Sequence, residues 1–357
     1  MKSLRFAILQ PLIPHYRTEF ISLLCQQIEK VDLYGYVNSE KSLASGFNLQ
    51  LETKYLRNLS WGPLLIYNPF PFIFRRYDTL VLMLNFAHIS TWMLLLTRFI
   101  HHKKIILWGQ GISVKRYLKE EINPDWKLKW MIALADGVWL YMDNEYLQWK
   151  NIFPDKPMVA LGNSLSGVKK MLGYKPDIPK KQMRQKYGID QDRVFIFCAR
   201  FENQYRRVDL LEEIIKKLDS KTNAFVIIGA GKYKPDFSEY NNVYDFGAVY
   251  DTNLKQELFA MADLYLQPGW VGLSIVEAMA YGKPICTFVR SENTLQCVEY
   301  SYIKDGENGM VFSDIDDCLN RLSFLSNDDI IRMGKNARYT ASIYTPDHMV
   351  EKAVSLL

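Results

Sequence analysis

Short apolar runs of strand length recur along the chain with helical patterns between them, in two series separated by one interruption. The first series consists of RFAILQ, VDLYGYV, TLVLML, KIILWG and GVWLYM, and the second of VFIFCAR, AFVIIGAG, VYDFG, LYLQP and KPICTF. Continuous apolar runs indicate strands that are buried on both faces, and their alternation with helices is typical of parallel sheets. The sequence therefore predicts an α/β protein with two doubly wound, Rossmann-like domains.

The interruption between the two series lies at residues 164–192, where glycine, proline and many lysines are mixed as in a linker. We therefore expect an N-terminal domain at 1–163, a second domain at 193–340 and a last helix at 341–357. Whether that helix packs back on the N-terminal domain stays open at this point. Parallel sheets bind ligands at the carboxyl ends of their strands, so two domains facing a cleft predict a two-part ligand or two ligands.

Composition excludes several classes of protein. The 357 residues carry 44 Lys and Arg against 39 Asp and Glu, and this mild excess without a basic tail indicates no nucleic-acid partner. The five cysteines are odd in number and form no C-x-x-C pair, which favours a reducing compartment over disulfides or zinc. The apolar segment 79–100 contains polar residues such as Asn85, so it indicates a strand and a helix and not a membrane span. A cytoplasmic location follows.

The most informative segment is QPGWVGLSIVEAMAYGKP, at residues 267–284. Two glycines and a proline precede a helix, so the amide N–H groups of Gly272, Leu273 and Ser274 are expected to bind an anion. Glu277, one turn into the same helix, can accept hydrogen bonds from a pair of sugar hydroxyls. Together these groups suit a nucleoside diphosphate. For the segment taken alone, the alternative is a core helix with a solvent-facing glutamate.

This segment resembles the donor-binding segment of the GT-B glycosyltransferases of family 4, also called glycosyl transferases group 1. Two glutamates eight positions apart contact the donor in that family. The ribose contact corresponds to Glu277, whereas the contact to the transferred sugar falls on Gly269, so half of the pair is absent. The form PG-x-VGLS-x-x-EA resembles a branch of bacterial surface-polysaccharide enzymes. The resemblance implies a GT-B fold and a UDP-sugar or GDP-sugar as the donor.

A second match, VFIFCARFENQYRRVDLLEEI at residues 194–214, resembles the part of the family that carries two cations for the donor diphosphate. Arg200 fills the first place and Arg206 the second, although a shift of one residue would select Arg207. Because the family's cations stabilise the departing nucleoside diphosphate, the resemblance implies no metal and no cofactor. Without it, an arginine pair at a strand end indicates a surface salt bridge. Gly247 falls in the family's base-side loop.

The N-terminal half is less similar, but PHYRTEF, LWGQG and LGNSL resemble features of the same branch. A histidine of the family falls on Gln110, which can hydrogen-bond a sugar but cannot act as a general base. The resemblance still implies retention, because the departing phosphate can take the proton of the acceptor. His88 is a further candidate contact, with a structural histidine as its alternative. His15 and Arg17 follow the first strand, and we expect Arg17 to contact a phosphate or the acceptor.

Aromatic and basic residues crowd two stretches of the N-terminal half, at residues 61–77 and 114–134. Rings beside cations suit a surface that rests on anionic lipid. The same residues also suit a core with a solvated face, and both interpretations stay open. Contact with lipid would fit a polyprenyl-linked glycan as the acceptor.

Two other functions and one metal motif compete with this interpretation. A non-catalytic nucleotide-sugar-binding or scaffold subunit is suggested by Gly269 and Gln110, which depart from the family pattern. GAGKYK begins like the dinucleotide site of an oxidoreductase, but Lys234 takes the place of the third glycine. Asp314 and Asp316 form a D-x-D motif just before a helix, where they are expected to act as caps and not as metal ligands.

Overall fold

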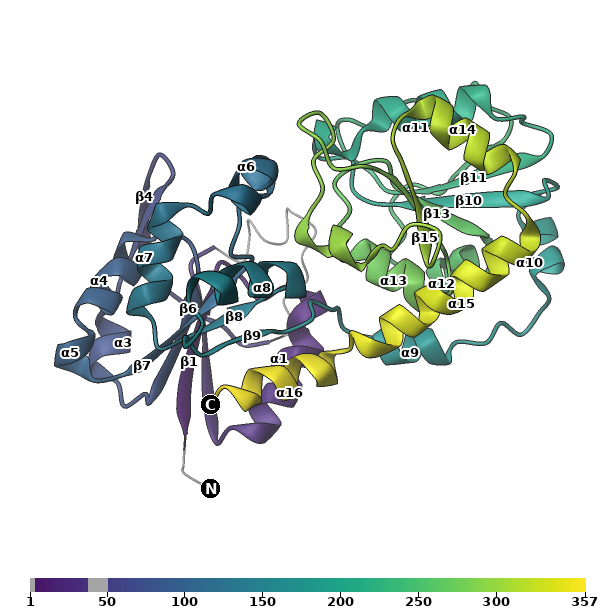
Figure 1. Cartoon of the computed structure of the whole chain (residues 1–357). Coiled ribbons are helices and arrows are strands. Elements are labelled where there is room, and N and C mark those ends of the chain that lie inside the picture. The colour runs from purple at the N-terminus through teal and green to yellow at the C-terminus, as the bar shows by residue number, and fades with distance from the viewer. Residues whose placement is uncertain (1–3, 38–50) are drawn as a thin grey trace. The chain divides into compact units, whose positions relative to one another are not determined.

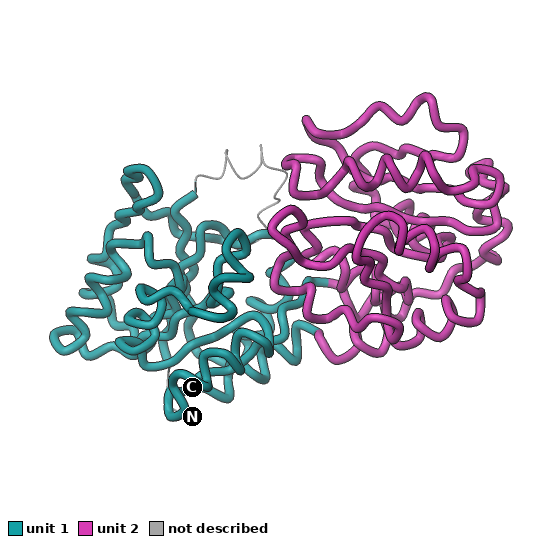
Figure 2. The backbone as a smooth tube through the Cα atoms, turned by 45° about the horizontal axis from the view of Figure 1, so that its top comes forward, with its two compact units in different colours: residues 1–166, 345–357 teal, residues 167–344 magenta. Residues whose placement is uncertain are grey.

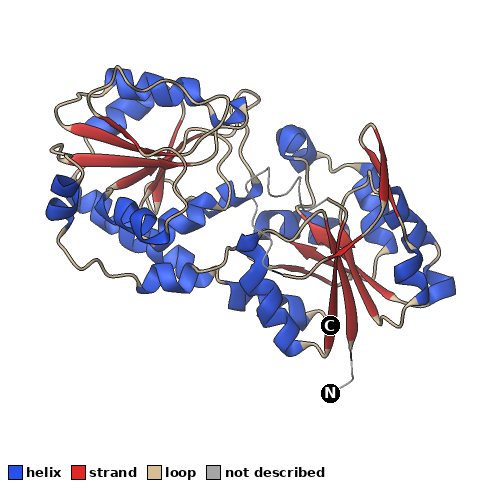
Figure 3. Cartoon of the chain, turned by 180° about the vertical axis from the view of Figure 1, so that it is seen from behind, coloured by secondary structure: helices blue, strands red, loops and turns tan. Residues whose placement is uncertain are grey.

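The computed structural model describes residues 4–37 and 51–357 (Figure 1). The chain forms two compact units, one of residues 1–166 with 345–357 and the other of residues 167–344 (Figure 2). In each unit helices cover both faces of a parallel sheet (Figure 3). The predicted α/β class with two doubly wound units is thereby confirmed.

The sheet of the first unit has seven parallel strands. Their order across the sheet is β3 (Lys54–Tyr55), β2 (Lys30–Gly35), β1 (Arg5–Gln10), β6 (Thr79–Met83), β7 (Lys104–Gly109), β8 (Gly137–Leu140) and β9 (Met158–Ala160). Among the described residues of this unit the helices are η1 (His15–Arg17), α1 (Thr18–Gln27), α3 (Phe70–Phe74), α4 (Ile89–Leu96), α5 (Arg98–His101), η2 (Val114–Arg116), α6 (Tyr117–Ile122), α7 (Trp126–Leu134), α8 (Asp143–Ile152) and α16 (Pro346–Ser355). The segment 79–100 thus forms the predicted strand, β6, and the predicted helical part, which is divided into α4 and the start of α5.

Side chains of each central strand point alternately to two cores, one on each face of the sheet. On β1, Ala7 and Leu9 join one core, whereas Phe6 and Ile8 join the other. Burial of a side chain as large as Leu9, Phe6 or Ile8 contributes about 1.5–3 kcal/mol to folding. This burial explains why the strands read as unbroken apolar runs in the sequence.

The sheet of the second unit has six parallel strands. Their order is β12 (Val243–Asp245), β11 (Asn223–Ile228), β10 (Arg193–Cys198), β13 (Leu264–Leu266), β14 (Ile285–Phe288) and β15 (Gly309–Phe312). The helices are α9 (Val168–Gly173), α10 (Lys180–Lys186), η3 (Gln204–Arg206), α11 (Val208–Lys217), α12 (Thr252–Met261), α13 (Ser274–Ala280), η4 (Val298–Tyr302), α14 (Ile315–Ser323) and α15 (Asn327–Ile343).

The segment 164–192 differs in detail from the sequence expectation, and the structure answers the open question of where the last helix packs. Residues 164–192, predicted as a linker, contain α9 and α10, and α9 packs against α13 and α15 of the second unit. The C-terminal residues 345–357 group with the first unit, where α16 lies beside α1 (Figure 1). The short strands β3 and β9 and an antiparallel hairpin, β4 (Asn58–Trp61) with β5 (Leu64–Tyr67), were not predicted.

The strand order reverses at one place in each sheet. The chain leaves β1 to build β2 and β3 on one side and then returns to β6 on the other side. In the second unit the same reversal lies between β10 and β13. Loops diverge at the carboxyl ends of such strand pairs, and this leaves room for a ligand. Both places are therefore candidate ligand sites.

No helix within residues 4–37 and 51–357 has the length and apolar character needed to cross a membrane.

Candidate functional site

The candidate donor site lies where the strand order of the second unit reverses. Arg200 follows β10 directly, and η3 then places Arg206 before α11. Residues 267–273 follow β13 and lead into α13, which carries Glu277. Because β10 and β13 are neighbouring parallel strands, these loops leave the same edge of the sheet. Arg206 and Glu277 are far apart in sequence, but both therefore follow strands that end at the same edge of this sheet.

Two buried glutamines hold the loop that follows β13. Gln267 accepts hydrogen bonds from Tyr265 (2.6 Å) and Ser274 (3.0 Å), and its amide donates to the carbonyl of Trp270 at 2.7 Å. Gln296 accepts from the amide of Val271 at 2.9 Å and donates to three other oxygens. Sequence analysis missed both roles, because nothing in the local pattern shows that these two side chains are fully buried.

Gly269, the place of the family's first glutamate, lies in tight contact with the loop that carries the arginines. A Cβ atom there would come within 2.5 Å of the Tyr205 carbonyl oxygen and 2.8 Å of Arg207 Cγ. Trp270 follows with φ +52° and stacks on Tyr205, with 4.9 Å between the ring centroids. Any side chain at Gly269 is therefore excluded by backbone packing.

The adjacent residues Arg206 and Arg207 have different partners. Arg207 pairs with Asp209 at 2.6 Å and donates to Thr294 Oγ1 at 2.6 Å. Arg206 donates to the carbonyl of Trp270 at 2.6 Å, and its Nε is buried without an acceptor in the described part of the chain. Burial lowers the pKa of Arg206, and the positive charge of Arg200 adds to this effect. Arg206 is thus close to Arg200 and retains an unused donor.

Glu277 is buried, with 7% of its surface exposed, and forms an ion pair with Lys255 of α12. Burial opposes the charge of Lys255, but Cys198 and Glu277 raise its pKa above the usual range. Burial raises the pKa of the Cys198 thiol to about 11, and the charged groups that act on it are Lys255, Glu277 and Arg206. Sequence analysis missed Lys255, which lies 22 residues before its partner.

The other predicted donor contacts are backbone positions. Among the described residues, the amide N–H groups of Gly272, Leu273 and Ser274 have no acceptor, as an anion site requires. Gly247 has φ +61° in the turn after β12, and its amide donates to Asp245 at 2.9 Å. This geometry leaves a ligand room beside it, because no atom lies within 4 Å of an added Cβ.

The competing motifs have structural roles. A Cβ on Gly231 of GAGKYK would lie 2.6 Å from the Phe201 carbonyl oxygen, so the glycine permits close backbone packing. Lys234 donates to the Gly229 carbonyl at 2.9 Å and to Asp245 at 2.6 Å. Asp314 caps α14 by accepting from the amide of Asp317, as predicted. The described residues contain no cluster of three or more His, Cys, Asp or Glu suited to a metal ion.

The predicted acceptor residues scatter around the carboxyl edge of the first sheet. Arg17 is buried at the end of η1, whereas His15 is exposed at its start. Gln110 is half-buried between Gly109 and Gly111. A Cβ on Gly109 would lie 2.9 Å from Leu84 Cβ, so this glycine serves packing.

His88 is a buried residue of the tyrosine-rich core. Its Nε2 lies 3.3 Å from the hydroxyl of Tyr36, and its ring meets the edge of Tyr67. Burial lowers the pKa of His88 to about 4, so the imidazole is neutral near pH 7. These contacts are those expected of a structural histidine, which was the alternative to a ligand contact.

The second unit contains a segment that matches a known protein family. Residues 192–328 match the family glycosyl transferases group 1. This match runs from β10 through β15 and contains Arg200, Arg206 and Glu277. No curated protein sequence matches the chain.

Solved structures show the fold of the whole chain. Anabaena HepE in complex with UDP is 14% identical, with 99% of each chain covered and a TM-score of 0.64. The lipopolysaccharide outer core galactosyltransferase WaaB is 16% identical, with 99% of each chain covered and a TM-score of 0.66. The N-terminal domain of Candida albicans trehalose-6-phosphate phosphatase is 9% identical, covers 100% of this chain and 97% of its own, and has a TM-score of 0.64. The architecture is the GT-B fold.

Proposed function

We propose that this protein is a retaining glycosyltransferase of family 4 that moves a sugar from a UDP-sugar or GDP-sugar to a glycan acceptor. The observation that carries the proposal is the grouping of Arg206, Glu277 and Lys255 within the segment that matches glycosyl transferases group 1. Bacterial surface-polysaccharide synthesis, with a polyprenyl-linked acceptor, is the setting that its sequence pattern favours. The proposed location is the cytoplasm.

Each group has a distinct proposed role at the donor. Arg200 and Arg206 neutralise the diphosphate, with the unused Nε of Arg206 available to an oxygen, and this charge role requires no metal. The amides of residues 272–274 contact the same phosphates, and Glu277 accepts from the ribose hydroxyls. The acceptor hydroxyl attacks the anomeric carbon as the bond to the phosphate breaks, and the departing phosphate takes the hydroxyl proton.

Turnover of a donor panel tests this proposal. The full chain is incubated with UDP-sugars and GDP-sugars, with and without a polyprenyl-linked acceptor, and released nucleoside diphosphate is measured. We expect Arg200→Ala and Glu277→Ala to lower release at least about a hundredfold, since each removes a charged contact. The matched controls are Arg332→Ala, at an exposed position of α15, and Glu213→Ala, at a half-buried position of α11 with 43% of its side chain exposed. Wild-type rates in both site variants would overturn the assignment.

We also propose that the first unit contacts an anionic membrane surface. The structure divides the aromatic residues of 61–77 and 114–134: Tyr67 and Phe72 are buried, whereas others are exposed. The exposed apolar side chains lie on the hairpin and on α3, α4, α5 and α7, and α4 contacts β5, α5 and α7. They include Trp61, Phe70, Phe74, Leu96, Phe99, Trp126 and Trp130, which we call the apolar rim. Arg75 and Arg76, both exposed after α3, supply positive charge beside it.

A non-catalytic nucleotide-sugar-binding or scaffold subunit is the second candidate function. The observation in its favour is Gly269, where packing against Tyr205 leaves no room for the family's sugar-contacting glutamate. Such a subunit would bind a nucleoside diphosphate but release none from a donor. The turnover panel, combined with calorimetry of the same nucleotides, distinguishes the two candidates.

A further inference from the structure

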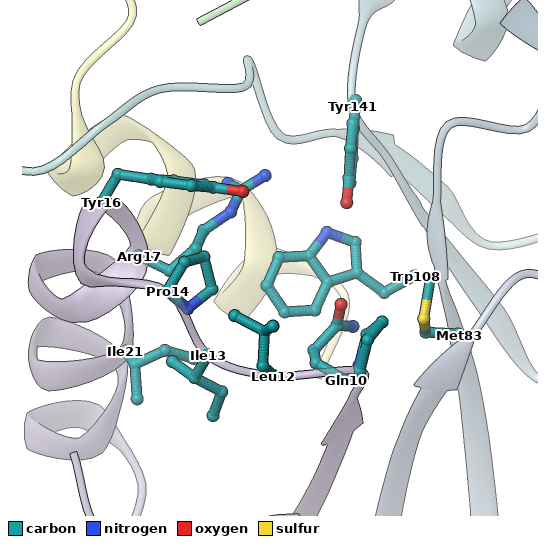
Figure 4. A pocket seen from close by; sticks show the side chains of 11 residues that line it. Gln10, Leu12, Ile13, Pro14, Tyr16, Arg17, Ile21, Met83, Trp108 and Tyr141 are labelled. Atoms are coloured by element: carbon teal, nitrogen blue, oxygen red, sulfur yellow. The ribbon is translucent and has the colours of Figure 1, made fainter. Parts of the chain in front are cut away.

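A cavity of about 190 Å³ lies where the strand order of the first sheet reverses. Gln10 at the end of β1, Met83 at the end of β6 and Trp108 of β7 line it, together with Tyr16, Arg17 and Tyr141 (Figure 4). This volume is well above what a single water molecule needs, so the cavity has room for several waters or for a compact polar group. Tyr16, Met83 and Tyr141 are only half-buried, so the cavity is accessible from solvent.

Arg17 is the charged residue of this cavity, and 7% of its surface is exposed. The guanidinium carbon lies 5.2–5.7 Å from the ring centroids of Tyr16, Trp108 and Tyr141. The Arg17 side chain donates one weak hydrogen bond, from Nη1 to the sulfur of Met349 in α16 at 3.9 Å. In the described part of the chain, no carboxylate forms an ion pair with Arg17. A buried charge of this kind is costly unless an opposite charge joins it.

Two side chains that line the cavity, Gln10 and Trp108, each carry a buried nitrogen donor. Gln10 is 9% exposed and Trp108 2% exposed, and neither Gln10 Nε2 nor Trp108 Nε1 has an acceptor within residues 4–37 and 51–357. Figure 4 shows the side chains of Gln10, Trp108 and Arg17 on the lining of this cavity. Native proteins rarely leave buried donors unsatisfied, so these two donors, together with the buried Arg17 guanidinium, favour an acceptor group in the cavity.

We propose that this cavity binds an anionic group, either the carboxylate of an acidic sugar or a phosphate monoester, carried by the acceptor. That the acceptor carries this group rests on the proposed function. That the group is an anion rests on Arg17, Gln10 and Trp108. Carboxylate and phosphate oxygens accept hydrogen bonds from a guanidinium, an amide and an indole N–H. A neutral sugar offers hydroxyls, which would leave the charge of Arg17 without compensation.

The aromatic side chains have two roles in this arrangement. They fix the Arg17 guanidinium through cation–π contacts, which leave its N–H groups available to a ligand. Tyr16 and Tyr141, half-buried on the lining, also offer apolar ring faces of the kind on which a sugar can rest. An acidic sugar would satisfy both features of the cavity at once.

Calorimetry with matched small molecules tests the proposal. The full chain is titrated with methyl α-glucuronide, with methyl α-glucoside, which lacks only the carboxylate, and with glucose 1-phosphate. We expect at least one anion to bind at least about tenfold more tightly than the neutral glucoside, as charge-assisted hydrogen bonds require. The arm that binds identifies carboxylate or phosphate as the source. Equal affinity for all three, or binding of none, would overturn the proposal.

Two variants then locate the bound anion. Arg17→Gln removes the charge, and we expect at least about a tenfold loss of anion affinity. Trp108→Phe removes the indole N–H and keeps an aromatic ring, so it provides a second reading if Arg17→Gln fails to fold. Arg57→Gln, at an exposed position of the same unit, is the control. Unchanged anion affinity in Trp108→Phe and in a folded Arg17→Gln would contradict the cavity as the site.

Binding of UDP and GDP separates this inference from the proposed function. If either nucleotide binds wild-type protein and Arg17→Gln equally, the donor site is intact and the anion result concerns the cavity alone. If no nucleotide binds but an anion does, the proposed function fails while the cavity inference stands.

Discussion

Lys255 Nζ lies 2.8 Å from both carboxylate oxygens of Glu277. The two side chains come from α12 and α13, and 30% of the Lys255 side chain and 10% of that of Glu277 remain exposed. A partly buried carboxylate held by a cation has a fixed orientation before any ligand arrives. We infer that Lys255 positions Glu277 for the ribose hydroxyls, an arrangement that lowers the entropic cost of binding.

Replacing Lys255 tests this positioning role. In Lys255→Met the Glu277 charge loses its partner, and we expect the free energy of unfolding to fall by about 1–3 kcal/mol. The KM for the donor should rise more than kcat falls, because substrate contact is affected before the chemical step. Denaturant unfolding and steady-state kinetics measure the two effects, and Lys255→Arg should restore part of the lost KM. An unchanged donor KM would show that the pair is structural only.

Gly269 provides a prediction about packing. The added Cβ of Gly269→Ala meets the Tyr205 carbonyl oxygen at 2.5 Å, so we expect a loss of about 2 kcal/mol or more in unfolding free energy. Gly269→Glu should be no more active than wild type, although it restores the family's residue. Gly173→Ala, where no atom lies within 4 Å of the added Cβ, should change stability by less than about 0.5 kcal/mol. Wild-type stability of Gly269→Ala would contradict the packing account.

The sequence predicted the order of strands and helices well because its apolar runs reflect burial on two faces. Phe6 to Leu9 all lie in the cores, and the alternation of their contacts confirms a covered parallel sheet. The short strands β3, β9 and the hairpin carry little apolar periodicity, and the hairpin exposes Leu59 and Trp61. Such elements follow from tertiary contacts that a local pattern does not contain.

The candidate site was predictable where motifs are local and not where partners are distant. Glu277 and the arginines belong to continuous segments of sequence. The sequence did not distinguish Arg206 from Arg207, whereas in the structure Arg207 is already engaged by Asp209 and Thr294. Lys255 and Gln296 act through long-range contacts, so neither had a sequence signal. Arg17 was selected for its place after the first strand, but its ring contacts and its burial became visible only in the structure.

His88 predicts a pH dependence of stability. Burial lowers its pKa to about 4 in the folded protein, below the value of about 6.5 in an unfolded chain. The unfolded state therefore binds a proton first, and stability that is present above pH 6.5 falls as the pH drops toward 4. At about 1.4 kcal/mol per pKa unit, the loss reaches about 3 kcal/mol.

Urea unfolding at pH 4–7 measures this loss in wild type and in His88→Gln, which cannot titrate. The difference in unfolding free energy between the two proteins isolates the histidine from the carboxylates. We expect the variant to have the flatter profile between pH 6.5 and 4. Parallel profiles would show that His88 does not titrate below its ordinary range.

The apolar rim predicts binding to anionic vesicles. Phe74 and Phe99 are 77% and 73% exposed, and we expect the double variant Phe74→Ser, Phe99→Ser to weaken cosedimentation with phosphatidylglycerol vesicles. Phe324→Ser, which removes an 82% exposed ring from the second unit, is the matched control. Added salt should also weaken binding, since each nearby cation contributes about 1 kcal/mol at low salt. Equal binding to neutral phosphatidylcholine vesicles would contradict the electrostatic part.

The central claim, that the second unit binds a nucleoside diphosphate between Arg206 and Glu277, is tested most directly by calorimetry. UDP, GDP and CDP are titrated into wild type, Arg206→Ala, Glu277→Ala and the cavity variant Arg17→Gln. The account predicts that at least one nucleotide binds, that both donor-site variants weaken it by about tenfold or more, and that Arg17→Gln does not. Absence of binding by all three nucleotides, or equal affinity in wild type and both donor-site variants, would contradict it.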